Sequence, residues 1–313
     1  MSSGAPTSAV TVIGCVQVDV VMSPVTDLPA AGGTLLTEQA VIRVGGAGAN
    51  AALAAVEAGM DVRLIGSTGD DPLGEWTRRQ LAPAGLDDEL VMAAGETTGL
   101  TVVLESPERD RTFLTYLGVN ARWEAAMIPD DALTCENLLL CDYFVAPMLR
   151  GEAARRLLDT ARARGARTFF DTTWDPDGFS GEARDEVREL LGSVDVFLPN
   201  EIEVCALADR PGDPAEAARA LQAVSGGWVV VKLGPSGCLA VGPDGAEVSA
   251  AARAVDVVDT TGAGDAFNAG LVHALSGGAD WQQALAQATR FATAIISRPS
   301  NDRYAVALTE ARR

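Results

Sequence analysis

Residues 259–267 carry the side chains best suited to chemistry in this sequence: an aspartate, two threonines, the run Gly-Ala-Gly and a second aspartate, Asp265. Glycine and alanine at the start of a helix let several backbone N–H groups point at one concavity, which suits an anion. Asp265 is expected at that helix start or just inside it. An aspartate beside an anion hole suits phosphoryl transfer to an alcohol, because the amides hold the developing charge while the carboxylate accepts the hydroxyl proton. The alternative is an aspartate that caps a helix after a glycine turn.

A second glycine cluster, residues 45–51, follows a strand-like stretch at 34–44 and opens a helical pattern. Its spacing fits the fingerprint of dinucleotide-binding folds, and the acidic pair Asp70 and Asp71 lies about 20 positions further on. Two details weaken this interpretation. The fingerprint should follow the first core strand, and residues 65–69 separate the acidic pair from the end of its strand.

A sugar-binding interpretation uses the same cluster. Glycines such as Gly46 allow close backbone approach to a sugar, and Asn50 offers its side-chain amide to sugar hydroxyl groups. Asp19, expected in the loop after the first strand, accepts a hydrogen bond from another hydroxyl in this interpretation. The alternative for Asp19 is a turn residue without a ligand.

Two polar groups follow other strand-like runs. Asn200 is a good helix N-cap, and Glu203 completes a capping-box spacing. Alternatively, the two residues orient Mg²⁺ through water against nucleotide phosphates, since Mg²⁺ commonly keeps several waters. Lys232, followed by Gly234 and Gly237, either holds phosphate as a point charge or is a surface residue at a turn. Lys232 does not follow the glycine pattern of a Walker A loop, which excludes a P-loop NTPase.

Composition narrows the classes of function. The net charge is −19 and the chain has a single lysine, so phosphodiester backbones and anionic lipids are repelled, and neither nucleic acid nor membrane is an expected partner. With one histidine, in a helix-like run, acid–base chemistry falls to carboxylates. The five cysteines form no CxxC pair and are expected to be free thiols. No apolar run approaches the ~20 residues that span a bilayer, and the polar start lacks signal-peptide features, so the expected location is the cytoplasm.

Short apolar runs alternate with longer helical patterns along the chain. The strand-like runs are residues 9–14, 62–66, 138–145, 166–171, 194–199 and 228–233, with another at 254–258 ahead of the Asp265 segment. The helical patterns include residues 48–58, 73–81, 151–164, 182–191 and 214–224. This alternation predicts an α/β fold whose mostly parallel central sheet is covered by helices on both faces.

Residues 34–44 and 99–117 break this alternation, because β-branched residues alternate there with no helix between. The second stretch predicts a hairpin of strands 100–105 and 112–117 around a polar turn at 106–110. These strands are expected to pair into a small sheet that projects from the main one. Such a sheet serves either as a lid that excludes water from a site or as an edge sheet without function.

Taken in order along the chain, these segments resemble the ribokinase, or PfkB, family of sugar kinases. The matching positions are Gly14 and Asp19; Gly45, Gly46 and Asn50; Thr98, Gly99, Arg111, Thr112 and Phe113; Gly118, Val119, Asn120 and Ala121; Pro199, Asn200, Glu201 and Glu203; Lys232, Leu233, Gly234 and Gly237; and residues 259–267. The resemblance implies one ribokinase-like domain over residues 1–313, a three-layer α/β sandwich. It also implies a β-sheet lid from about residues 16–44 and 97–120, and a homodimer formed through that lid.

The resemblance also implies a role for each matching residue. Asp265 becomes the catalytic base, with an anion hole formed by the amides of Gly262, Ala263 and Gly264. The sugar contacts Asp19, Gly46, Asn50 and Asn120, and the nucleotide lies against Asn200, Lys232, Gly234 and Gly237. Glu203 contacts Mg²⁺ through a water molecule. The implied cofactors are ATP and Mg²⁺, and the implied partner is a small sugar.

Three departures from the family pattern bear on the substrate and the cofactors. Ala47 stands where ribokinases commonly have lysine, and residues 143–147 lack the carboxylate that commonly follows the middle strand, so ribose is not favoured. Ser300 replaces a C-terminal glycine near a monovalent-cation site, which leaves potassium (K+) activation open. The expected function is an ATP-dependent kinase of a small sugar or sugar acid. The alternatives are a nucleoside kinase and a catalytically silent sugar- or nucleotide-binding protein on the same fold.

Overall fold

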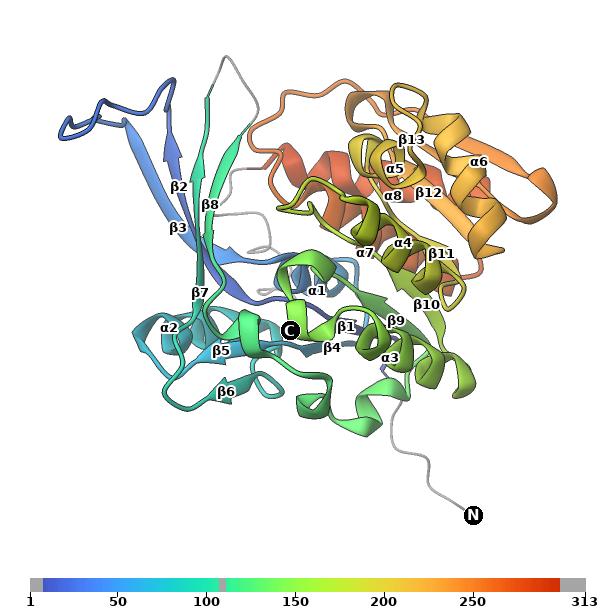
Figure 1. The fold of residues 1–313 in the computed structure, drawn as a ribbon, viewed down its shortest axis with the longest axis horizontal. Coiled ribbons are helices and arrows are strands. Elements are labelled where there is room, and N and C mark those ends of the chain that lie inside the picture. Colours follow the sequence, from blue (N-terminus) through green and yellow to red (C-terminus); the bar gives the residue numbers. More distant parts are fainter. Residues whose placement is uncertain (1–7, 107–110, 299–313) are drawn as a thin grey trace.

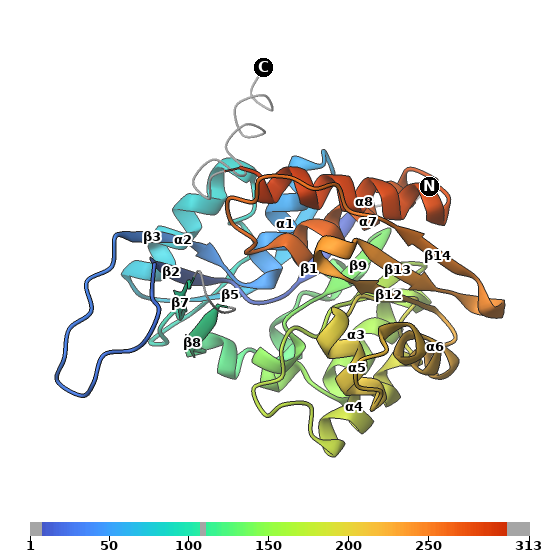
Figure 2. The same cartoon turned by 90° about the horizontal axis from the view of Figure 1, so that it is seen from above.

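The computed structural model describes residues 8–106 and 111–298, which form a helix–sheet–helix sandwich with a second sheet beside it (Figure 1, Figure 2). The central sheet has eight strands in the order β14-β13-β12-β11-β10-β9-β1-β4, and the strands from β12 to β4 run parallel. Their bounds are β1 Val10–Ile13, β4 Val62–Ile65, β9 Asn137–Leu140, β10 Arg167–Phe170, β11 Val196–Phe197, β12 Trp228–Lys232, β13 Cys238–Val241 and β14 Glu247–Ala250. Central strands such as β1 and β9 are buried along their whole length, as expected for a parallel sheet covered on both faces.

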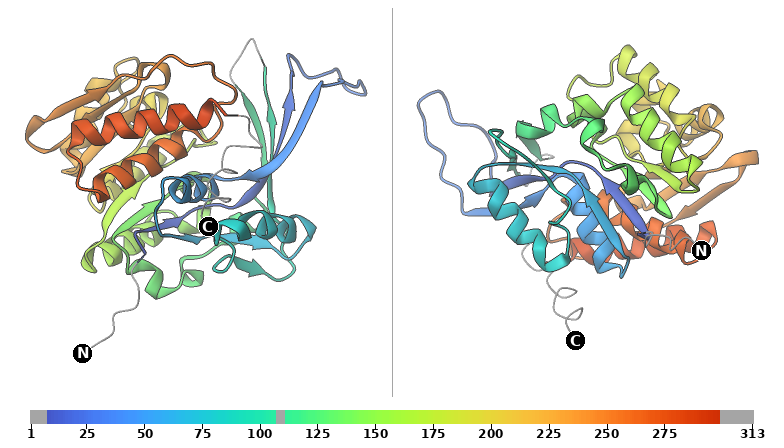
Figure 3. Two further views of the ribbon diagram at one scale, coloured as in Figure 1. Left: turned by 180° about the vertical axis from the view of Figure 1, so that it is seen from behind. Right: turned by 90° about the horizontal axis from the view of Figure 1, so that it is seen from below.

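Helices cover both faces of this sheet (Figure 1, Figure 3). One core cluster packs under α1 (Ala47–Glu57), α7 (Ala263–Ser276) and α8 (Trp281–Ile296), and the other under α3 (Glu152–Ala163), α4 (Gly181–Leu191), α5 (Glu201–Ala208) and α6 (Pro214–Ser225). The predicted α/β class with a mostly parallel sheet is confirmed. Among the described helices, none has the length and apolar character to cross a membrane.

The second sheet, called the lid sheet here, projects from the sandwich (Figure 1). Its strand order is β3-β2-β7-β8, with bounds β2 Gln17–Ser23, β3 Gln39–Gly45, β7 Gly99–Leu104 and β8 Thr112–Tyr116. The predicted hairpin is confirmed in the antiparallel pair β7 and β8, although residues 107–110 of its turn lie outside the described residues. A short parallel pair, β5 (Ser67–Gly69) and β6 (Val91–Ala93), lies beside α2 (Pro72–Leu81).

Several predicted elements need correction. The strand expected at 254–258 is wrong: this segment has no regular structure, and Val255 and Val257 line a cavity instead of packing in a sheet. The strand expected at 138–145 ends at Leu140, because Asp142 turns the chain with a left-handed backbone (φ 60°). Asp19 lies inside strand β2 and not in a loop, because the chain passes from β1 into the lid sheet within three residues. The antiparallel strands β13 and β14 were not predicted.

Candidate active site

A cavity of about 780 Å³ lies where strands β10, β11 and β12 end and helix α7 begins. In parallel α/β sheets, ligands bind outside the carboxyl ends of the strands. One wall is polar and is formed by Asp171, Asn200, Glu203, Lys232 and Asp265. The other is mainly apolar and includes Ala252, Val255, Val257, Ala292 and Ile296. A cavity divided in this way suits a ligand with a charged end and a flat apolar end.

Asp265 lies in the first turn of α7, as the sequence predicts. The N-cap of this helix is Gly262, whose left-handed backbone (φ 74°) turns the chain into the helix. The amide of Ala263 bonds the carbonyl of Thr260 at 3.1 Å, so it closes this turn. The amides of Gly264 and Asp265 follow at the helix start, where backbone N–H groups have no partner within the helix. They are the donors best placed for an anion.

The electrostatic environment of Asp265 favours proton acceptance. Burial, followed by the charges of Asp171 and Asp142, raises its pKa well above the usual range. Lys232 and a hydrogen bond from the Asn50 side chain oppose this rise. A carboxylate with a raised pKa next to helix-start amides is suited to accept a proton while the amides hold negative charge.

Lys232, the only lysine of the chain, lies in a buried ion pair. Its Nζ is 2.6 Å from Oδ2 of Asp171, and Asn268 donates to the same oxygen at 2.5 Å. Burial lowers the pKa of Lys232, but Asp171 and Glu203 outweigh it and raise the pKa overall. A Cβ atom at Gly264 would lie 3.5 Å from Nζ, so the ammonium group sits directly against the helix start. Lys232 is therefore not a surface residue at a turn.

Asn200 and Glu203 form the capping box that their spacing predicts, at the start of α5. The side chain of Asn200 accepts from the amides of Ile202 and Glu203 at 2.9 Å, and Oε2 of Glu203 accepts from the amide of Asn200 at 2.8 Å. Burial, followed by the charge of Asp171, raises the pKa of Glu203 to about 7, against the opposing effects of Lys232 and the Asn200 amide. The second carboxylate oxygen of Glu203 is not needed for the cap, and the residue lines the cavity. Capping and a role at the site are compatible.

The glycine cluster at 45–51 follows strand β3 of the lid sheet, which argues against a dinucleotide fingerprint. Gly46 has a positive φ of 90°, and a Cβ atom there would lie 2.2 Å from the carbonyl oxygen of Cys15. Close packing of the start of α1 against Cys15, in the segment between β1 and β2, therefore requires this glycine. The amides of Gly48 and Cys15 both donate to Oδ2 of Asp142 at 2.9 Å. Burial is the largest cause that raises the pKa of Asp142 to about 6.

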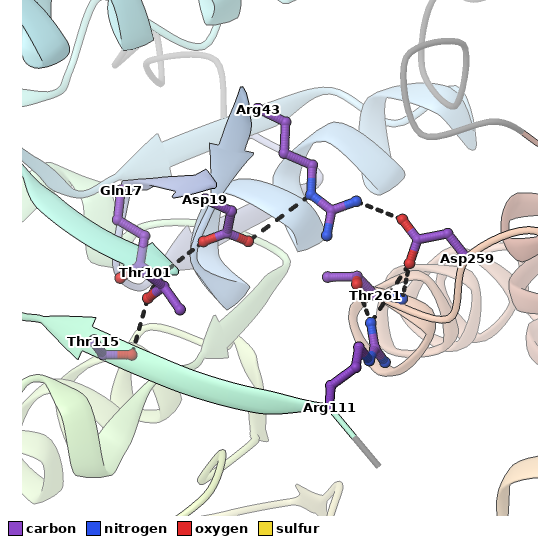
Figure 4. Close-up of polar contacts among 8 residues, drawn as sticks. All are labelled: Gln17, Asp19, Arg43, Thr101, Arg111, Thr115, Asp259 and Thr261. Atoms are coloured by element: carbon purple, nitrogen blue, oxygen red, sulfur yellow. Dashed lines mark hydrogen bonds and ion pairs between the residues drawn. The ribbon is translucent and has the colours of Figure 1, made fainter. Parts of the chain in front are cut away.

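The expected sugar contacts lie on the lid side of Asp265. Asp19 is buried in β2, where it accepts from Gln17 at 3.2 Å and lies 4.0 Å from Nε of Arg43 (Figure 4). Asn120 is fully buried and accepts from the Ser67 hydroxyl at 3.3 Å. Its Nδ2 has no hydrogen-bond partner among the described residues. Because buried amides are normally paired, this unpaired donor is a candidate contact for a bound hydroxyl group.

The structure thus brings the predicted residues together in two groups. Around the cavity lie Asn200, Glu203, Lys232, Gly234, Gly237, Ala263, Gly264 and Asp265. Asp19, Gly46, Asn50, Asn120 and Gly262 do not line this cavity; Gly262 is the N-cap of α7, and Asn50 joins the two groups through its hydrogen bond to Asp265. Sequence reasoning missed Asp142, Asp171 and Asn268. For Asp171 the available signal was an acidic residue at the end of a strand-like run; Asp142 was hidden inside the strand expected at 138–145, and for Asn268 there was no signal.

Comparison with known proteins identifies the family of the chain. The family model described as pfkB family carbohydrate kinase matches residues 8–303. The chain is 27% identical to a nucleoside kinase of Methanothermobacter thermautotrophicus, covering 81% of this chain and 77% of the relative. It is also 27% identical to a 5-dehydro-2-deoxygluconokinase of Shouchella clausii, covering 85% and 84%.

A solved structure shows the same fold. It belongs to an E. coli protein proposed to be ribokinase II and contains ATP and Mg²⁺. It superposes with a TM-score of 0.81 at 22% identity and covers 98% of this chain and 99% of its own. The sandwich and lid sheet described above are therefore those of the ribokinase-like fold. With the match over residues 8–303, the chain belongs to the pfkB family of carbohydrate kinases.

Proposed function

We propose that this kinase transfers the γ-phosphoryl group of ATP to a hydroxyl group of a small sugar or sugar acid, with Asp265 as the general base. The observation that carries the proposal is the position of the Asp265 carboxylate in the first turn of α7, against the polar wall of the cavity. The acceptor hydroxyl gives its proton to Asp265 as its oxygen bonds to phosphorus and the bond to the β-phosphate oxygen breaks. The amides of Gly264 and Asp265 hold the developing charge, and Lys232 places a fixed positive charge beside them.

The cavity suits the nucleotide. Its apolar wall fits a nucleobase, while Asn200, Lys232, Gly234 and Gly237 border the position of the phosphates. Among the described residues there is no group of three or more acidic, histidine or cysteine side chains that could hold a metal ion. This agrees with Mg²⁺ held by phosphate oxygens and water, with Glu203 as the nearby carboxylate. Bound Mg²⁺ supplies positive charge to the phosphates, and the E. coli relative with ATP and Mg²⁺ supports both cofactors.

The acceptor hydroxyl lies between Asp265 and the lid sheet in this proposal. Asp19 and Asn50 offer an acceptor and an amide to the sugar, Asn120 offers its unpaired Nδ2, and Gly46 allows close backbone approach. A nucleoside kinase is the second candidate, supported by the relative from Methanothermobacter. A catalytically silent binding protein is the third, and the intact Asp265 with its helix-start amides argues against it.

The decisive test combines one variant with an acceptor panel. ADP release should be measured with sugars, sugar acids and nucleosides, and the best acceptor used for Asp265→Asn. We expect kcat to fall by about 10³-fold or more with nucleotide binding retained, since an uncharged amide cannot accept the proton. Asp256→Asn, at an exposed position of the same loop, is the control and should keep wild-type turnover. Near-normal turnover of Asp265→Asn would refute the assignment, and sugar binding without ADP release from any acceptor would favour the silent protein.

Three further features are part of the proposal. A homodimer through the lid sheet is supported by its exposed apolar side chains, Ile42 (59% exposed), Phe113 (55%), Leu114 (53%) and Tyr116 (59%). Light scattering of wild type and Ile42→Asp tests it, because a charge there should yield monomers.

The net charge of −19 argues against nucleic acid or membrane partners, and five free cysteines suit the reducing cytoplasm. The question of potassium activation concerns Ser300, which lies outside the described residues. It is tested by comparing the turnover rate in KCl with that in choline chloride.

A further inference from the structure

A row of polar side chains crosses all four strands of the lid sheet (Figure 4). In the strand registers Arg43 pairs with Asp19, Asp19 with Thr101, and Thr101 with Thr115. Residues in register point to the same face of a sheet. Gln17 donates to Thr101 at 2.7 Å and to Asp19 at 3.2 Å, and the hydroxyls of Thr101 and Thr115 are 3.0 Å apart. The row is therefore one connected network on one face.

The network ends on the loop ahead of the anion hole. Nη1 of Arg43 donates to Oδ2 of Asp259 at 2.5 Å, and both side chains are largely buried, at 14% and 7% exposed. The other oxygen of Asp259, Oδ1, accepts from the backbone amide of Thr261 at 2.7 Å. Thr261 directly precedes Gly262, the N-cap of α7. The Asp259 carboxylate thus fixes the turn that places the helix-start amides.

Arg111 holds the same loop from the other edge of the lid sheet. It directly precedes β8 and donates to the hydroxyl of Thr260 at 2.6 Å and to the hydroxyl of Thr261. Its Nη1 also lies 3.5 Å from Oδ1 of Asp259. Two guanidinium groups from opposite edges of the lid sheet therefore clamp the loop that leads into α7 (Figure 4).

Arg43 has a second carboxylate neighbour. Its Nε lies 4.0 Å from Oδ2 of Asp19, while its Nη1 bonds Asp259. A planar guanidinium presents two edges and can serve two carboxylates at once, which the ammonium group of lysine cannot do in this geometry. One side chain therefore joins the carboxylate assigned to the acceptor with the carboxylate that fixes the anion-hole turn.

We propose that Arg43 is a positioning residue that couples acceptor binding at Asp19 to the geometry of the anion hole, acting through Asp259. A hydroxyl group that donates to Asp19 weakens the electrostatic attraction between Asp19 and Arg43, and the guanidinium then bonds more fully to Asp259. The turn at Thr261 and the amides of α7, which Asp259 already holds through its bonds to Arg43 and Thr261, are thereby held more firmly when an acceptor is bound beneath the lid sheet. Transfer to water is thereby disfavoured. This inference rests on the proposed function for its kinetic part.

The kinetic test compares Arg43→Gln, Asp259→Asn and the double variant with wild type, using ATP and the best acceptor of the panel. We expect Arg43→Gln to lower kcat by about 10- to 100-fold, because a displacement near 1 Å at reacting groups costs this much. ATP hydrolysis without acceptor should fall by a smaller factor than transfer to the acceptor, since Arg43 restrains the anion-hole turn more strongly when an acceptor is bound. The double variant should be no slower than the slower single variant, because the two residues act as one unit.

The matched control is Arg63→Gln. Arg63 also joins two carboxylates, Glu89 at 2.5 Å and Asp131 at 3.0 Å, and its side chain is 20% exposed. It lies on β4, at the end of the strand away from the cavity. A loss of kcat in Arg63→Gln equal to that in Arg43→Gln would show a general stability effect and overturn the proposal. Arg43→Lys keeps the charge but cannot span both carboxylates, so it should lose kcat as well, and it carries the test if Arg43→Gln does not fold.

Hydrogen exchange tests the structural part without any acceptor. The amide of Thr261 should exchange at least about threefold faster in Arg43→Gln than in wild type and remain unchanged in Arg63→Gln, because its acceptor on Asp259 loses an anchor. Unchanged exchange at Thr261, or kcat losses that multiply in the double variant, would overturn the coupling. Because exchange needs no turnover, failure of the coupling is distinguishable from failure of the kinase assignment, which Asp265→Asn decides.

Discussion

Replacement of Glu203 by glutamine should stabilise the protein at alkaline pH while it impairs the reaction. Glu203 is 4% exposed, and burial followed by the charge of Asp171 raises its pKa from 4.5 to about 7. Between these two values the folded chain keeps a proton that the unfolded chain releases. The unfolded state therefore binds fewer protons, and the free energy of unfolding falls as pH rises through this window. Above it, the folded state carries the full cost of a buried charge.

The size of the effect follows from the displacement of the pKa. Each pKa unit corresponds to about 1.4 kcal/mol, so the ionised Glu203 costs roughly 3 kcal/mol at pH 8 and under about 1 kcal/mol at pH 5. Glutamine at the same position keeps the capping box with Asn200, because either residue can accept from the N-cap amide. We therefore expect Glu203→Gln to unfold in urea with a free energy about 2 to 3 kcal/mol above wild type at pH 8 and nearly equal to it at pH 5.

The control and the activity assay separate this effect from a general one. Glu201 lies on the same helical turn but is exposed, so Glu201→Gln should change stability by less than about 0.5 kcal/mol at either pH. ADP release by Glu203→Gln should fall by about 10-fold or more and require more Mg²⁺, because the carboxylate proposed to lie near Mg²⁺ and the phosphates is lost. If Glu203→Gln is no more stable than wild type at pH 8, the cause assigned to its raised pKa is wrong.

Two further predictions concern residues that the fold places under constraint. Lys232→Met should destabilise the chain by about 3–5 kcal/mol in urea unfolding, because it leaves Asp171 buried without its ion-pair partner. Adding Asp171→Asn should recover much of the loss, and a cost below about 1 kcal/mol for the single variant would contradict the buried ion pair. Gly46→Ala should cost at least about 3 kcal/mol, since its Cβ would overlap the Cys15 carbonyl, whereas Gly59→Ala, also at positive φ but in open space, should cost about 1–2 kcal/mol. Equal losses by thermal unfolding would show that the backbone conformation alone matters.

The sequence predicts the local features of this site well. Alternating apolar runs predict the parallel sheet, and the glycine-rich segment predicts that Asp265 lies at the start of a helix, because both depend on residues close together in the chain. The strand expected at 254–258 is wrong, because Val255 and Val257 face the cavity and do not pack in a sheet. An apolar run shows that the side chains avoid water, but it does not show whether they pack in a sheet or face a ligand.

The partners of the predicted residues could not be found in this way. Asn268 and Lys232 meet on Asp171, which lies 97 and 61 positions away in sequence. Asp142 reaches the start of α1 across 94 positions, to Gly48. These contacts depend on the order of strands in the sheet, which periodicity does not reveal. Asp142 also directly follows a run of apolar residues. Its contacts with the amides of Cys15 and Gly48 become apparent only when the strand is known to end before it, at Leu140.

The structure also explains why a chain with so strong a negative charge keeps its one lysine in the site. Asp142, Asp171 and Asp265 approach one another at the ends of parallel strands and at the start of α7, and the first two raise the pKa of the third. As the proposed general base, Asp265 must be ionised to accept a proton, so this repulsion makes it a stronger base at the expense of its ionised fraction. Lys232 lowers the pKa of Asp265 again and neutralises Asp171. Its position therefore sets the compromise between basicity and ionisation, while its charge lies against the amides that are proposed to hold the transferred phosphoryl group.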